Sequence, residues 1–169
     1  EDEPLPIAAG QTISQPYIVA LMTEAMAIGP GDRVLEVGAG SGYALAILSR
    51  IVSGEGGEAF GIERHAELVE QAADRLARLG YDNARVRHGD GSLGWPEEAP
   101  FDAILVSAGG PEIPPALVEQ LAVGGRLVIP VGWESGAQEL LVVRVDADGR
   151  LRRESLGPVR FVPLVGDAS

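Results

Sequence analysis

The sequence predicts an α/β fold, a doubly wound and mostly parallel sheet with an antiparallel edge at its C-terminal end. Through residues 33–130, short apolar segments alternate with amphipathic ones, the pattern of a parallel sheet with crossover helices on both faces. A glycine-rich loop follows the first apolar segment. After Pro130, two β-rich segments flank a turn sequence at 146–149, which predicts a hairpin. With 169 residues, the chain is expected to form one domain over 1–169.

Hydrophobic periodicity places the individual elements. Short runs rich in Val, Ile and Leu indicate strands, whereas apolar residues three and four positions apart indicate helices. The clearest helical stripe joins Leu68, Ala72 and Leu76. A proline pair at 114–115 is typical of a helix start. The expected elements are a helix at 18–27, a strand at 33–37, a helix at 43–52, a strand at 58–62, a helix at 66–79, strands at 84–88, 101–107 and 126–130, and a hairpin at 138–146 and 151–156.

Charge and composition argue against several classes of partner. The chain has 25 acidic residues and 13 basic ones, all arginine, and its net charge of -12 repels phosphate backbones. No apolar run reaches the ~18 residues of a membrane span, and no signal-peptide pattern opens the chain. We therefore expect a cytoplasmic monomer that binds neither nucleic acid nor membrane. A start at Glu1 also fits a piece of a longer chain.

Cysteine and histidine, the residues of thiol chemistry and of most zinc sites, are scarce. The sequence has no cysteine, which excludes disulfides, zinc knuckles and a thiol nucleophile. Its two histidines, His65 and His88, lack the short spacing of a helical metal pair. No metal site is predicted.

The most informative segment is the loop at 36–43, Glu-Val-Gly-Ala-Gly-Ser-Gly-Tyr. Its glycines let the backbone turn sharply and leave no Cβ between the chain and a ligand, so a nucleotide-like cofactor can lie against the main chain. A tight strand-to-helix turn without a ligand is the alternative. The candidate cofactor residues in the loop are Glu36, Gly38, Ala39, Gly40, Ser41 and Gly42.

Acidic residues after the next two strands strengthen the cofactor interpretation. Glu63, with Arg64 beside it, follows the loop at the interval at which a carboxylate reaches the two hydroxyls of a ribose. Asp90 precedes Gly91 after the third strand, where its carboxylate could accept a hydrogen bond from the amine of an adenine. Alone, that second segment can also be only a turn.

The glycine spacing separates two possible cofactors. A dinucleotide-binding loop usually has Gly-x-Gly-x-x-Gly and places a pyrophosphate at the helix start, whereas this loop has Gly-x-Gly-x-Gly. Glu36 would repel a pyrophosphate but could hold a cationic amino group. S-adenosyl-L-methionine has such a group, an adenosine and no phosphate. We therefore favour it over NAD.

Further blocks resemble the protein-L-isoaspartate O-methyltransferase family over nearly the whole chain. The most specific is Gln-Thr-Ile-Ser-Gln-Pro at 11–16. The resemblance implies a Rossmann-like class I methyltransferase fold. It also implies an enzyme that methylates the α-carboxylate of L-isoaspartyl residues in damaged proteins or peptides, whose ester then closes to a succinimide. The blocks lie at 4–7, 10–16, 36–43, 88–91, 99–103, 111–114, 124–132 and 159–164.

By the same resemblance, Ser14 matches the active-site serine that steers the acceptor carboxylate. Gln11, Thr12 and Ile13 would line the junction of cofactor and substrate. The alternative for Ser14 is that it only caps the following helix, since serine is a favoured N-cap residue. The chemistry itself needs little acid–base catalysis, because a carboxylate is already ionised near pH 7.

The sequence also departs from the family pattern. Family members usually carry some tens of residues before the block at 4–7, so an N-terminal segment is expected to be missing here. Gly109 and Gly110 stand where alanine or proline is more usual, so small residues are retained but a more flexible acceptor-side loop is predicted. These departures leave open methylation of a normal aspartate in a dedicated peptide, which forms an aspartimide. Another methyl acceptor, a dinucleotide oxidoreductase and a non-catalytic module that binds the cofactor also stay open.

Overall fold

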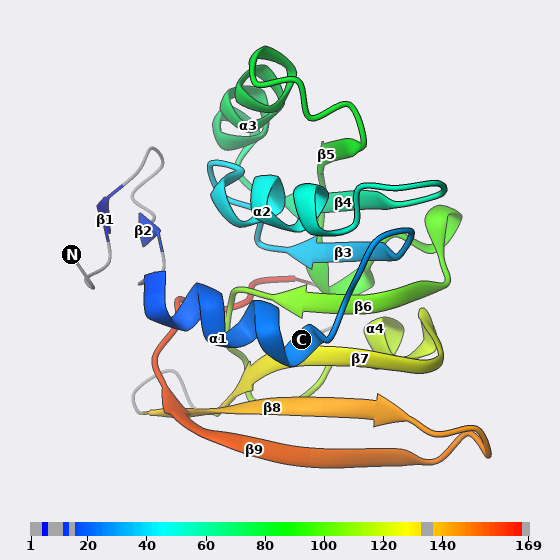
Figure 1. The fold of residues 1–169 in the computed structure, drawn as a ribbon. Helices are drawn as coiled ribbons and strands as arrows, with labels where there is room; N and C mark the ends of the chain where they lie inside the picture. Colours follow the sequence, from blue (N-terminus) through cyan, green and yellow to red (C-terminus); the bar gives the residue numbers. More distant parts are fainter. Residues whose placement is uncertain (1–4, 7–11, 14–15, 133–136, 167–169) are drawn as a thin grey trace.

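The computed structural model describes residues 5–6, 12–13, 16–132 and 137–166 (Figure 1). The predicted site residues Gln11 and Ser14 lie outside this part of the chain. A two-stranded antiparallel sheet near the N-terminus pairs β1, Leu5–Pro6, with β2, Thr12–Ile13. In the part of the chain that the structure describes, no helix is long and apolar enough to cross a membrane.

A seven-stranded sheet forms the centre of the fold, in the order β5-β4-β3-β6-β7-β8-β9 (Figure 1). The first five strands in this order, from β5 through β4, β3 and β6 to β7, are parallel. The last two, β8 and β9, pair antiparallel. The order reverses at β3, whose neighbours are β4 and β6, and ligands of such sheets bind at this point. The strands are β3 Arg33–Val37, β4 Glu58–Glu63, β5 Ala84–His88, β6 Phe101–Val106, β7 Leu121–Val131, β8 Gln138–Val145 and β9 Leu151–Val159.

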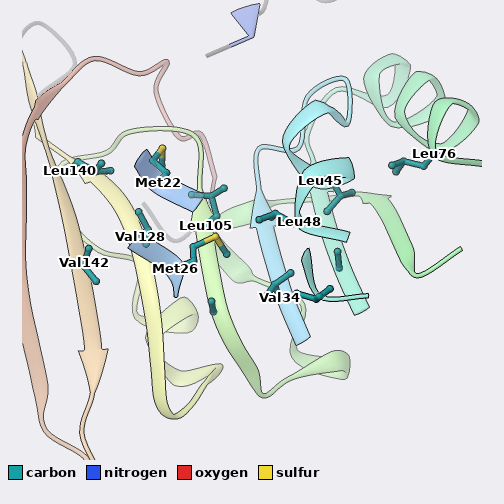
Figure 2. Close-up of a cluster of buried hydrophobic side chains, with 13 residues drawn as sticks. Met22, Met26, Val34, Leu45, Leu48, Leu76, Leu105, Val128, Leu140 and Val142 are labelled. Atoms are coloured by element: carbon teal, nitrogen blue, oxygen red, sulfur yellow. The ribbon is translucent and has the colours of Figure 1, made fainter. Parts of the chain in front are cut away.

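Alternation along the strands divides the core into two layers, as in β3, where Val34 belongs to one buried cluster and Leu35 to the other. On the first face, Met22 and Met26 of α1 lie near Leu105 and Val128 of the sheet (Figure 2). The first cluster takes residues from α1, α2 and α3, and the second takes Leu117 from α4. The helices are α1 Pro16–Met26, α2 Tyr43–Ile51, α3 Ala66–Arg78 and α4 Pro115–Glu119, with short 3-10 turns at Gly91–Leu93 and Pro96–Glu98.

The structure confirms the predicted fold class and shifts some element bounds. The strands at 33–37 and 84–88 have their predicted bounds. However, β7 begins at Leu121 and not at 126, because its pairing with β6 continues through an irregularity between Phe101 and Ala103. That early part contains Gly124 and Gly125, whose lack of side chains hides a strand from periodicity. Likewise, β9 continues through Gly157 and Pro158 to Val159.

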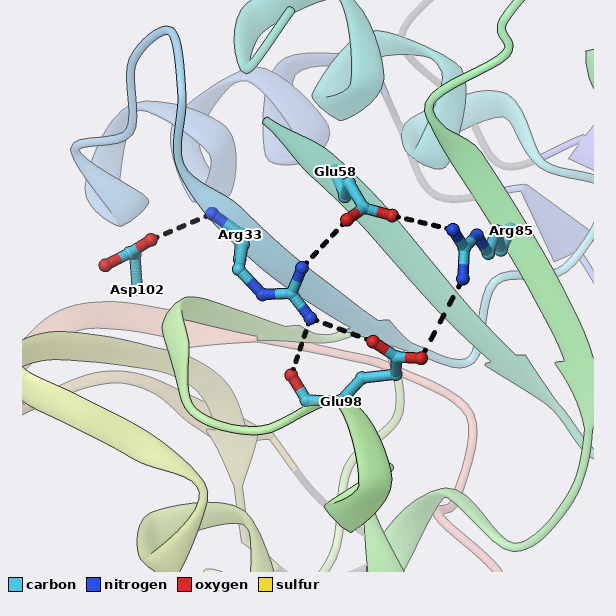
Figure 3. A network of polar contacts seen from close by, with 5 residues as sticks. All are labelled: Arg33, Glu58, Arg85, Glu98 and Asp102. Carbon is cyan, nitrogen blue, oxygen red and sulfur yellow. Dashed lines mark hydrogen bonds and ion pairs between the residues drawn. The ribbon is translucent and has the colours of Figure 1, made fainter. Parts of the chain in front are cut away.

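A polar network ties the β3–β4–β5 part of the sheet to the loop before β6 (Figure 3). Arg33 donates to Glu58 at 2.8 Å and to Glu98 at 2.9 Å, while Arg85 contacts the same two carboxylates at 3.1 and 3.8 Å. The backbone N–H of Arg33 also donates to Asp102 at 2.8 Å. Both guanidinium groups lie over the ring of Phe60, at 5.0 and 5.7 Å from its centroid. The network thus lies where β3 and β4 begin.

We expect Arg33→Met to lower the free energy of unfolding by about 1 kcal/mol without changing the affinity of the cleft described below. The side chain of Arg33 is 31% exposed, so solvent weakens its ion pairs, although its stacking on Phe60 is also lost. Arg33→Lys should recover only part of the loss, because an ammonium cannot make the same forked contacts. Urea unfolding measures the change, and equal stability of all three proteins would contradict a stabilising network.

Candidate functional site

A cleft opens at the carboxyl ends of the parallel strands, beside the point where the strand order reverses. Its empty volume, including the part open to solvent, is about 840 Å³. One wall is the glycine loop after β3, and another comes from the segment after β9. The lining residues are Val19, Glu36, Val37, Gly38, Ala39, Gly40, Ser41, Tyr43, Ala44, Ile62, Glu63, Arg64, His65, Gly91, Ser107, Ala108, Val162, Pro163, Leu164 and Val165.

The glycine loop keeps its shape through positive φ angles and backbone hydrogen bonds. Gly38 and Gly42 have φ of 85° and 88°, which side-chain-bearing residues rarely adopt. The N–H groups of Gly38 and Ala39 both donate to the carbonyl of Ile62, at 2.9 and 3.1 Å. A Cβ at Gly42 would lie only 3.1 Å from the Cβ of Ala72, so glycine also lets α3 approach the loop. The main chain of the glycine loop therefore has a fixed shape where it lines the cleft.

Glu63, at the end of β4, orients the loop and faces the cleft. One carboxylate oxygen accepts from the N–H of Gly40 at 2.9 Å, and the other accepts from the N–H of His65 at 2.8 Å. These bonds hold the buried carboxylate in one orientation. Each oxygen keeps further acceptor capacity, so the group can still receive two ligand hydroxyls.

Glu36 is the most unusual residue of the cleft. Its side chain is buried at the end of β3, and its Oε2 accepts from the hydroxyl of Ser107 at 3.3 Å. Its Oε1 has no hydrogen-bond partner within the described part of the chain. Burial raises the pKa of Glu36 to about 8, the Ser107 hydroxyl opposes that rise, and the negative charge of Glu63 adds to it. A buried acceptor without a partner fits a ligand that brings a positive charge.

Ser41 presents a second polar atom of this kind. Its side chain is buried and lines the cleft, and its hydroxyl also finds no partner among the described residues. Buried polar groups in folded proteins nearly always have a hydrogen-bond partner. Two exceptions on one loop therefore indicate that a polar ligand completes their bonding.

The remaining predicted residues take different places around the cleft. Arg64 and Gly91 line it. Asp90 does not line it, and its carboxylate accepts from the N–H and hydroxyl of Ser92 at 3.0 and 2.7 Å. Its contact with an adenine stays a prediction. The described backbone of Thr12–Ile13 forms β2, whereas Gln11 and Ser14 lie outside the described residues.

The segment 162–165 is the wall that sequence reasoning missed. It was matched only as part of a family block, because an apolar segment without regular structure carries no local sign of a site. The loop at 109–110 holds this segment, and its flexibility stays a prediction. Gly109 donates to the carbonyl of Val162 at 2.7 Å and accepts from the N–H of Leu164 at 2.6 Å. Gly110 forms a bridge with Val131.

Metal-binding side chains do not gather in the described residues. No group of three or more His, Asp or Glu side chains there could hold a metal ion. The cleft instead combines a preformed glycine loop, two carboxylates and apolar walls, which suits an organic ligand with hydroxyls and a cationic group.

Comparison with known proteins decides the family. The model of the protein-L-isoaspartate(D-aspartate) O-methyltransferase family matches residues 1–169. The chain belongs to this family.

Close relatives carry the same name. A protein-L-isoaspartate O-methyltransferase of Methylorubrum populi is 60% identical over 164 residues, which cover 97% of this chain and 74% of the relative. Protein-L-isoaspartate O-methyltransferase 2 of Pelobacter propionicus is 58% identical over 166 residues, which cover 98% of this chain and 72% of the relative.

Two solved structures of protein-L-isoaspartate O-methyltransferases share the fold. One has a TM-score of 0.89 at 34% identity and covers 99% of this chain, and the chain spans only about half of it, 54%. The other, a putative enzyme from Plasmodium falciparum in complex with S-adenosyl-L-homocysteine, has a TM-score of 0.84 at 32% identity and covers 98% of this chain and 81% of its own. Both confirm the Rossmann-like methyltransferase fold expected for a member of the protein-L-isoaspartate O-methyltransferase family.

Proposed function

We propose that this protein transfers a methyl group from S-adenosyl-L-methionine to the α-carboxylate of L-isoaspartyl residues in damaged proteins or peptides. Family membership supports the reaction, and one observation in the cleft carries the choice of cofactor. Glu36 places a buried oxygen, which has no hydrogen-bond partner among the described residues, in the cleft beside the glycine loop. A pyrophosphate would gain no attraction from this carboxyl and would hold it in its protonated form, whereas the cationic amino group of S-adenosylmethionine would favour the ionised form and complete the bonding of Glu36.

Each cleft residue then has a role in holding the cofactor. Glu63 accepts hydrogen bonds from the ribose hydroxyls, and Glu36 holds the amino group directly or through water. The hydroxyl of Ser41 and the backbone of the glycine loop complete the cradle, and Asp90 is assigned to the adenine. When bound, S-adenosylmethionine supplies a methyl group on a sulfonium, which is already a good leaving group.

Methylation of the acceptor carboxylate requires correct orientation more than it requires proton transfer. A carboxylate is ionised near pH 7, so no general base is needed to activate it. Holding two reactants in one cleft lowers the barrier to methyl transfer, because binding has already removed their translational and rotational freedom. We assign the positioning of the acceptor carboxylate to Ser14, with Gln11, Thr12 and Ile13 at the junction of donor and acceptor.

Matched peptides test the proposed substrate. Two peptides that differ only in L-isoaspartate or L-aspartate at one position are incubated with the protein and radiolabelled methyl donor. We expect methylation of the isoaspartyl peptide with strong preference. Ser14→Ala should slow methylation more than it weakens cofactor binding, because the hydroxyl orients the acceptor. A preference for normal aspartate would favour an aspartimide-forming enzyme, and cofactor binding without turnover would favour a non-catalytic module.

Flanking charge should modulate turnover on isoaspartyl peptides. With a net charge of -12, the protein repels acidic peptides before they reach the cleft. We expect peptides with Asp or Glu beside the isoaspartate to have lower kcat/KM than peptides with Ser or Ala there, and the difference should shrink at high salt. Initial rates over a peptide panel measure this effect. Faster turnover with acidic flanks would contradict it.

A further inference from the structure

We propose that Gln138 is a positioning residue that holds the segment 161–165 as a wall of the cofactor cleft and so sets how long the cofactor stays bound. The proposal rests on the proposed function, because the cofactor is its readout. Gln138 is the first residue of β8 and its side chain is 2% exposed. It does not itself line the cleft.

The carboxamide of Gln138 extends the sheet beyond the end of β9. Main-chain pairing of β8 with β9 ends at Gln138 and Val159. Two residues later, the side-chain oxygen of Gln138 accepts from the N–H of Phe161 at 2.8 Å, and its Nε2 donates to the carbonyl of Phe161 at 3.3 Å. One side chain thus bonds both backbone groups of Phe161, as a neighbouring strand would.

The bonds between Gln138 and Phe161 lie next to the residues that form the cleft wall. Gly109 lies against the carboxamide, since a Cβ there would come within 2.2 Å of its Nε2. Gly109 also bonds Val162 and Leu164, which line the cleft. Figure 1 shows the chain leaving β9 at the edge toward which the parallel strands point and crossing that edge. Gln138, Gly109 and the wall therefore form one continuous set of contacts.

The far end of the segment is also fixed. A Cβ at Gly166 would lie within 2.0 Å of a carboxylate oxygen of Asp90, so the chain packs closely against the turn after β5. The wall is consequently held at Phe161, by Gly109 and at Gly166. Loss of the first anchor should loosen the half of the segment that begins at Phe161.

The chain provides a matched control in Gln120. This buried side chain also makes two backbone bonds, accepting from the N–H of Trp95 at 2.8 Å and donating to the carbonyl of Leu93 at 2.9 Å. A glycine, Gly94, packs against its carboxamide in the same way. None of these residues lines the cleft. Gln120→Met should therefore cost as much stability as Gln138→Met, while the segment 161–165 keeps its bonds to Gln138 and Gly109.

The experiment measures S-adenosylhomocysteine binding and thermal unfolding for the wild type, Gln138→Met and Gln120→Met. We expect Gln138→Met to weaken binding by about tenfold, mainly through faster dissociation, as expected for the loss of a pair of buried hydrogen bonds. Gln120→Met should bind like the wild type, with a similar fall in its unfolding temperature. Equal affinity of Gln138→Met and Gln120→Met would overturn the proposal.

Limited trypsin digestion gives a readout that needs no ligand. Arg160 is exposed and directly precedes the anchored residue, so release of the segment should speed cleavage after Arg160. Mass spectrometry should detect the fragment that begins at Phe161 sooner from Gln138→Met than from Gln120→Met, and S-adenosylhomocysteine should slow its appearance. An unchanged rate of this cleavage in Gln138→Met would also overturn the proposal.

Two further comparisons cover a variant that does not fold and a protein that does not bind the ligand. If Gln138→Met does not fold, Gln138→Asn keeps the carboxamide on a side chain one carbon shorter, which weakens both bonds to Phe161, so an intermediate affinity is expected and wild-type affinity would overturn the proposal. If the wild type does not bind S-adenosylhomocysteine, the proposed function fails. The trypsin comparison then still decides whether Gln138 holds the segment.

Discussion

Glu36→Gln is expected to weaken S-adenosylhomocysteine binding by at least about a hundredfold while making the ligand-free protein more stable at alkaline pH. The ligand carries the same amino group as the methyl donor. Replacing the carboxylate by a carboxamide of equal size removes the buried negative charge opposite that group and puts N–H groups in reach of it. Calorimetric titration measures the loss of affinity. Unchanged affinity would show that the amino group lies elsewhere.

The gain in stability follows from the raised pKa of Glu36. Its folded pKa of about 8 lies above the ordinary value of 4.5, so the folded state binds the proton more tightly. Stability from this group is complete below pH 4.5 and is lost as the pH rises toward 8. Glutamine has no such penalty, so above pH 8 the variant should be more stable by a few kcal/mol, on the order of the shift. Unfolding temperatures at pH 6 and pH 9 check the sign.

Proton release gives a second test of the same residue. At pH 7 the ligand-free carboxyl is mostly protonated, because its pKa is about 8. Pairing with a cationic amino group favours the ionised form, so binding should release up to one proton, and affinity should increase between about pH 6 and 7.5. Titrations in buffers of different ionisation enthalpy count that proton. Glu58→Gln, at the other end of the sheet, is the matched control and should release as many protons as the wild type.

Glu63→Ala is expected to weaken S-adenosylhomocysteine binding by about 10- to 100-fold, corresponding to roughly 1 to 3 kcal/mol. The change removes the predicted partner of both ribose hydroxyls and also the acceptors that hold Gly40 and His65. Competition with adenosine and with 2′,3′-dideoxyadenosine separates the two losses. Adenosine should lose affinity for the variant, whereas dideoxyadenosine, which lacks both hydroxyls, should bind wild type and variant more nearly alike.

A control residue separates ligand contact from support of the loop. Ser107→Ala removes a neutral hydroxyl from the same cleft and should have a much smaller effect than Glu63→Ala. If Glu63→Ala bound the ligand as tightly as the wild type, the ribose would have to lie elsewhere in the cleft. Tight NAD binding would reverse the choice of cofactor.

The sequence was informative where a function depends on local pattern. The glycines of the loop and the acidic residue that ends β4 can be recognised from spacing, because a strand, a turn and a helix place them without help from distant residues. The state of Glu36 could not be recognised this way. Its raised pKa arises from burial, and its hydrogen-bond partner Ser107 is 71 residues away in the chain.

The segment 162–165, the cleft wall that the sequence pattern does not reveal, also depends on distant residues. Val162 to Val165 form no strand or helix, and their position depends on Gln138 and on Gly109. Periodicity cannot detect a segment whose order comes from hydrogen bonds to residues far away in the chain. The first part of β7 was missed for a related reason, since Gly124 and Gly125 carry no side chains to reveal alternation.

The cleft unites distant parts of the chain, and this constrains when it can exist during protein synthesis. One wall follows β3 and another follows β9, the first and last strands of the seven-stranded sheet in chain order. A nascent chain that stops before Phe161 can form most of the sheet but lacks the second wall. The cofactor can therefore stabilise a nascent protein fully only after the segment beyond β9 has been made and docked.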